Sequence, residues 1–78
     1  MTYKAPKWEL GYSGNDAALH GHSESDPLGQ RRLAYAERLP GGGWQVTAGD
    51  GTWYPTRNLV DAQNLIEATL ILTGVIEP

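Results

Sequence analysis

The sequence predicts a small α+β domain, in which an antiparallel sheet of three or four strands, a meander, packs against one C-terminal helix. Two neighbouring patterns indicate this fold. Alternating apolar and polar residues flank the turn dipeptide Asp50-Gly51, which is typical of a tight hairpin over residues 44–54. Apolar residues then recur at helical spacing from about 59 to 73. The chain of 78 residues has room for one such domain, spanning 1–78.

The other expected strands precede the hairpin. Residues 7–12 and 31–39 each alternate between apolar and polar side chains, as half-buried strands do. Between them, clustered turn residues predict a flexible loop over about 13–30, in which residues 17–22 have a poor strand pattern. Pro55 is expected to end the last strand, because proline has no N–H to donate to a sheet. A small barrel of the SH3 or OB type is the alternative, although a long terminal helix suits it less well.

The helix has a start signal and a stop signal. Asn58 is a natural N-cap, Asp61 follows in the first turn, and Gly74 stands where a helix commonly ends. Ile71 falls outside the expected core stripe and helps to make the C-terminal end apolar all round. That end is expected to contact the sheet edge, a second copy of the chain or another protein, or to be covered by the chain after Gly74. The stripe expected to cover the sheet contains Leu59, Ala62, Leu65, Ile66, Thr69, Leu70 and Leu72.

Composition excludes several classes of function. The chain has no cysteine, so it has neither disulfides nor thiolate metal ligands. Its net charge is −3 and its six basic residues are scattered, whereas proteins that bind nucleic acid usually carry a basic stripe. No apolar run has the length of a membrane span and the N-terminus has no apolar signal-peptide core. We therefore expect a cytoplasmic protein without a membrane partner.

One cluster has the residue types of a metal site. His20 and His22 would face the same side of an extended segment, and Asp16, Glu24 and Asp26 lie nearby. Imidazole and carboxylate ligands suit zinc, nickel or iron. Because a structural site needs four ligands from a rigid frame, a solvated polar loop is the simpler interpretation, and the histidines remain only an alternative metal site.

No motif predicts catalysis. Serine, histidine and acidic residues share the 13–30 segment, but a catalytic triad requires rigid positioning and an oxyanion hole. The glycines at 41–43 and 49–51 do not directly precede a helix and lack the Lys-Ser/Thr of a phosphate-binding loop. The sequence therefore predicts no catalytic residue, no cofactor and no enzymatic activity.

The aromatic residues are the candidate binding residues. Trp53 and Tyr54 are adjacent in a strand and must point to opposite faces, so only one ring can enter a core beneath the helix. Tryptophan, tyrosine and arginine are enriched at interface hot spots, although cross-strand pairing within the sheet explains such rings equally well. The candidate partner-binding residues are Trp53, Tyr54, Arg38, Arg57, Tyr35 and Ile71.

In its size, acidic cysteine-free composition and strands-then-helix order, the chain resembles small accessory proteins of phages and mobile elements, including anti-CRISPR proteins. The resemblance implies a protein of the bacterial cytoplasm that docks on a host protein complex, for example a CRISPR effector, and blocks it sterically. In this interpretation, an aromatic and arginine patch and the loop over 16–30 contact the partner. A homodimer formed through the C-terminal helix is a further possibility. The alternatives are a nucleic-acid-binding or transcription-regulating module that uses sheet aromatics, and a metal-binding loop protein.

Overall fold

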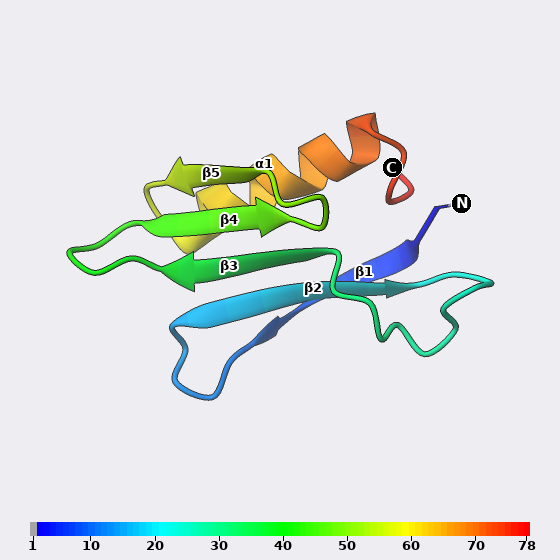
Figure 1. The fold of residues 1–78 in the computed structure, drawn as a ribbon, viewed down its shortest axis with the longest axis horizontal. Coiled ribbons are helices and arrows are strands. Elements are labelled where there is room, and N and C mark those ends of the chain that lie inside the picture. Colours follow the sequence, from blue (N-terminus) through cyan, green and yellow to red (C-terminus); the bar gives the residue numbers. More distant parts are fainter. Residues whose placement is uncertain (1) are drawn as a thin grey trace.

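The protein folds as a five-stranded antiparallel sheet with one helix against one face, in a computed structural model that describes residues 2–78 (Figure 1). The α+β class and the meander topology are confirmed, whereas the predicted number of strands, three or four, is wrong. The strands follow one another in the order β1-β2-β3-β4-β5. The elements are β1 (Lys4–Leu10), β2 (Asp16–His22), β3 (Ala34–Arg38), β4 (Trp44–Ala48), β5 (Trp53–Thr56) and α1 (Leu59–Leu72).

The additional strand is β2, which occupies much of the segment predicted to be a loop. It pairs with β1 on one side and β3 on the other. Its inward positions are Ala17, Leu19 and Gly21, all buried. Because two of these three residues are small, the apolar alternation is weak in the sequence. The strand is stabilised instead by backbone hydrogen bonds to a neighbouring strand on each side.

The rest of the predicted loop has a hydrogen-bonded frame built around Asp26. Its carboxylate accepts the backbone N–H groups of Gln30 (2.9 Å) and Arg31 (3.0 Å). It also accepts the hydroxyl of Tyr3 at 3.2 Å. The N–H bonds from Arg31 and Gln30 hold the pKa of Asp26 below its usual value, because they stabilise the ionised form. The segment expected to be flexible thus has hydrogen bonds within itself and one to Tyr3, the residue before β1.

The β4–β5 hairpin forms at the predicted turn but extends two residues further, to Thr56. Gly51 has a φ of +93°, the left-handed conformation for which glycine is favoured. The Ala48 N–H donates to the Thr52 carbonyl, so alternate residues of β5 bond to β4. By this alternation the nitrogen of Pro55 points to the open edge. An edge strand tolerates proline there, which is why the expected strand end at Pro55 is wrong.

The helix begins and ends at its local signals. The Asn58 side chain accepts the N–H of Asp61 at 2.9 Å, as an N-cap does. At the other end, Gly74 has a φ of +78° and donates its N–H to the carbonyl of Ile71. Within residues 2–78, no helix combines the length and apolarity that a membrane crossing requires.

The core lies between α1 and the β3–β5 part of the sheet (Figure 1). Ala34 and Ala36 on the covered face are small, so the helix can lie close to the sheet. The predicted helical stripe is too wide, because Leu65 is 40% exposed and Leu72 is 87% exposed. A single helix touches a sheet only along a narrow line. The buried residues that form the core cluster are Tyr3, Leu19, Leu33, Ala34, Ala36, Val46, Ala62, Ile66, Leu70 and Ile76.

The chain after Gly74 folds back over its own core, one of the alternatives left open by the sequence. Ile76 is buried and forms a parallel bridge with Tyr3, which places the described ends of the chain side by side (Figure 1). The Tyr3 N–H donates to the Val75 carbonyl at 2.8 Å, and the Glu77 N–H donates to the Tyr3 carbonyl at 3.0 Å. The C-terminal residues therefore act as a short additional strand beside the start of the chain.

Candidate functional site

No helix or second sheet packs on the face of the sheet that points away from α1 within residues 2–78 (Figure 1). Strand register aligns one row of side chains across it: Tyr35 on β3 pairs with Thr47 on β4, which pairs with Trp53 on β5. Two strand spacings place the Tyr35 and Trp53 backbones about 10 Å apart. Trp53 is 57% exposed, a large apolar surface with no covering element. This open face is the candidate binding surface.

Tyr35 is held at both its ring and its hydroxyl. Its hydroxyl donates to Oδ2 of Asp16 at 2.8 Å, and the Arg32 guanidinium lies 4.6 Å from the ring centroid. The bond to Asp16 raises the pKa of the Tyr35 phenol, since its proton is held between two oxygens; the negative charges of Asp16 and Glu37 act in the same direction. A ring fixed before a partner arrives loses little conformational entropy on binding.

The structure divides the six candidate residues among several surfaces. Trp53 and Tyr54 point to opposite faces as the alternation predicts, and Tyr54 is the ring that packs against the core beneath α1. Only Trp53 and Tyr35 share the open face. Arg38 pairs with Trp44 at the far end of β3, in register with the covered face, so it does not flank Trp53.

The two remaining candidates lie elsewhere. Arg57 is exposed in the connection between β5 and α1. Ile71 is 38% exposed on the helix, on the other side of the sheet from Trp53. The sequence analysis missed Arg32, whose guanidinium lies against Tyr35. Its position three residues before Tyr35, outside the strand, carries no local signal of that contact.

The two histidines lie on one face of β2, but they do not form part of a metal-ligand cluster. Nδ1 of His20 lies 2.8 Å from the carbonyl oxygen of Gly29, which requires that this nitrogen carry the proton. Within residues 2–78 no group of three histidine, cysteine or acidic side chains could hold an ion. The described geometry therefore gives the metal alternative no support.

Both edges of the sheet are poorly suited to adding another strand. On β1 the register shifts between Lys4 and Lys7, with Pro6 inside the irregular stretch. On β5 the nitrogen of Pro55 points outward, where it has no hydrogen to donate. Proline, lysine and bulges are the devices by which natural sheets block their edges. A partner would therefore meet a face of this protein more readily than an edge.

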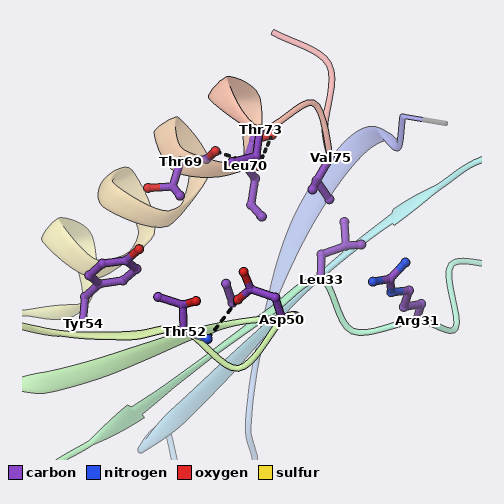
Figure 2. Close-up of a pocket in the computed structure, with 11 residues that line it drawn as sticks. Arg31, Leu33, Asp50, Thr52, Tyr54, Thr69, Leu70, Thr73 and Val75 are labelled. Carbon is purple, nitrogen blue, oxygen red and sulfur yellow. Dashed lines mark hydrogen bonds between the residues drawn. The ribbon is translucent and has the colours of Figure 1, made fainter.

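A separate cavity of about 190 Å³ lies on the helix side, between the β4–β5 turn and the C-terminal half of α1 (Figure 2). Leu33, Leu70 and Val75 form its apolar part. Figure 2 shows Asp50 reaching into it from the turn and Arg31 approaching from the other side. Tyr54, a candidate residue predicted for partner binding, contributes to this wall. The sequence did not predict the cavity, since its lining comes from three separate segments.

No family model, curated protein or solved structure matches the chain. The similarity to anti-CRISPR proteins thus stays a hypothesis based on size and architecture.

Proposed function

We propose that this protein is a non-enzymatic protein-binding module whose binding surface is the open face of the sheet. The observation that carries the proposal is the exposed Trp53 in one row with Tyr35, on a face where no described helix or second sheet packs. A few hot-spot residues supply most of the binding energy in protein interfaces, and tryptophan, tyrosine and arginine are enriched among them. Here Arg32 adds the third residue type beside Tyr35.

The charges on this face favour a protein over a nucleic acid. Glu9, Asp16 and Arg32 line a shallow hollow beside Tyr35, so carboxylates outnumber the single guanidinium there. Arg32 also lies over the Tyr35 ring, where a nucleic-acid base would otherwise stack. A phosphate backbone would be repelled by such a surface, whereas a basic protein surface would be attracted. In the row formed by Tyr35, Thr47 and Trp53, the nucleic-acid alternative therefore keeps Trp53 alone as a free stacking platform.

The role implied by the resemblance to phage accessory proteins belongs to the same proposal. A module of this kind, in a bacterial cytoplasm, would dock on a host complex such as a CRISPR effector and obstruct it sterically. Many such complexes bind nucleic acid and so present basic surfaces, which the carboxylates around Tyr35 would complement.

The test is an affinity pull-down of the tagged protein from bacterial lysate, read by mass spectrometry at low and high salt. Trp53→Ala is compared with Leu72→Ala, which removes an apolar side chain from α1 that is even more exposed than Trp53. We expect the wild type and Leu72→Ala to retain the same discrete protein complex at high salt. Trp53→Ala should lose it while keeping a native circular dichroism spectrum.

Two other results would contradict the proposal. Loss of the complex with Leu72→Ala instead of Trp53→Ala would place the interface on the helix. If Leu72→Ala also dissociated a dimer in size-exclusion chromatography, that result would support a homodimer formed through the helix. Nucleic acid recovered only at low salt would favour the nucleic-acid alternative.

A further inference from the structure

We propose that the cavity between the β4–β5 turn and α1 binds a small free α-amino acid with an apolar side chain. The cavity lies on the helix side of the sheet, away from Trp53, so this proposal does not depend on the protein-binding one. It rests on three features of the cavity: a carboxylate held by the turn, a guanidinium beside the same turn, and an apolar floor.

The carboxylate is that of Asp50, which would receive the ligand's ammonium group. Its Oδ1 accepts the backbone N–H of Thr52 at 2.9 Å, which holds the carboxylate above the turn and facing the helix (Figure 2). The same N–H bond lowers the pKa of Asp50, so the group is ionised at neutral pH. A carboxylate offers about four acceptor positions, so further ones remain for a ligand. A carboxylate oriented by the backbone is a ready partner for an ammonium group.

The helix end supplies further acceptors. The Thr69 hydroxyl donates to the Leu65 carbonyl at 2.9 Å, and the Thr73 hydroxyl donates to the Thr69 carbonyl at 3.0 Å. Since each hydroxyl has given its proton to the helix, it can only accept from a ligand. The last turn of α1 has no basic residue, so the partial negative charge of the helix end is uncompensated. All of these features favour a positively charged donor.

The guanidinium is that of Arg31, which would receive the ligand's carboxylate. Its Nη2 lies 3.7 Å from the point that a Cβ on Gly49 would occupy, which places it beside the turn that carries Asp50. Neither the Arg31 guanidinium nor the Asp50 carboxylate is in an ion pair with another side chain within residues 2–78. Two unpaired, opposite charges at one mouth match the adjacent ammonium and carboxylate of an amino acid.

The apolar floor and the volume define the rest of the ligand. Leu33 and Leu70 are buried core residues that contribute to the cavity wall, and Val75 completes the floor. The volume of about 190 Å³ equals that of about six waters at ~30 Å³ each. Such a space admits a branched aliphatic side chain.

The experiment is an NMR titration of the isotope-labelled full chain with L-leucine to tens of millimolar, because so small a ligand binds weakly. The comparison ligands are isoamylamine, which lacks the carboxylate, 4-methylpentanoate, which lacks the ammonium, and glycine, which lacks the side chain. We expect leucine to shift the backbone amides of residues 49–52 and 73–75 with saturation. Isoamylamine and 4-methylpentanoate should each bind at least about tenfold more weakly, the change expected when one charged contact is lost. Glycine should be weakened at least about as much, because it buries no apolar side chain in the cavity.

Two variants and two controls test the roles of the charged residues. Asp50→Asn keeps an oxygen for the Thr52 N–H and removes only the charge; Arg31→Gln removes the guanidinium. Both should weaken leucine binding about tenfold or more, whereas Asp61→Asn and Arg57→Gln, exposed and outside the cavity, should not change it. The proposal is overturned if leucine leaves the cavity amides unshifted. It is equally overturned if isoamylamine binds as tightly as leucine, or if either cavity variant binds leucine normally.

Discussion

Nε1 of the Trp8 indole donates a 2.7 Å hydrogen bond to Oε1 of Glu67, which joins the first strand to the middle of the helix. The main helix contacts are otherwise with β3, β4 and β5. This bond, together with the bridge between Tyr3 and Ile76, therefore ties the outer strand of the sheet to the layer above it. Trp8 and Glu67 are 59 positions apart in the chain, so this bond is a long-range contact between the first strand and the C-terminal helix.

Trp8→Phe should lower the free energy of unfolding by about 1–2 kcal/mol, because it removes a hydrogen bond to a charged acceptor at a partly exposed site. Trp44→Phe is the matched control. Trp44 also packs against the core, but its indole N–H has no hydrogen-bond partner within residues 2–78. Chemical denaturation of both variants checks the prediction, and equal losses would show that only ring volume matters.

Ile66→Ala should lower the free energy of unfolding by about 2–5 kcal/mol, since Ile66 is fully buried beneath the sheet and its removal leaves a cavity. In so small a domain this loss would unfold much of the population at elevated temperature. Leu72→Ala, on the same helix but exposed, should change stability by less than about 0.5 kcal/mol. Thermal and urea unfolding measure both. If the two variants lost similar free energy of unfolding, Leu72 would belong to the core, as the sequence predicted.

Stability should fall in acid partly through Asp26. Its folded-state pKa lies below its usual value of about 3.9, so its contribution is complete above that value and is lost as the pH falls through the lowered pKa. Asp26→Asn should therefore be less stable than the wild type at pH 7, and the difference should shrink below about pH 4. Urea unfolding across this range measures it. A difference that stayed constant with pH would show that the charge is irrelevant.

The phenol of Tyr35 should ionise above its usual pKa of about 10, because Asp16 accepts its proton. The raised pKa favours the neutral phenol in the folded state, so this stabilisation is present below pH 10 and disappears as the pH rises through the folded pKa. NMR of ¹³C-labelled tyrosine resolves the residue from the other three. Asp16→Asn should lower the pKa more than Glu37→Gln, which acts only through charge. The reverse order would mean that the hydrogen bond is not the main cause.

Local signals were sufficient wherever a structure depends on a few consecutive residues. The N-cap at Asn58 and the positive φ at Gly51 and Gly74 are properties of short backbone segments, and the residue types required there can be read directly. The strand β2 could not be predicted in this way, since small residues at its inward positions leave little apolar pattern. Its hydrogen bonds come from β1 and β3, and whether those strands align with it is not encoded in the residues of β2 themselves.

The sequence by itself determined the fold class, the hairpin, the helix and the fact that Trp53 and Tyr54 face opposite ways. Only the tertiary structure decided that Tyr54 faces the core and Trp53 the open side, because that choice depends on which face α1 covers. It also placed Arg32 over Tyr35, and brought Arg31 and Asp50 to one cavity beside the helix end. The Arg32 contact depends on the path of the chain into β3, and the cavity forms only when the sheet and the helix pack together, so neither carries a periodic or local signal in the sequence.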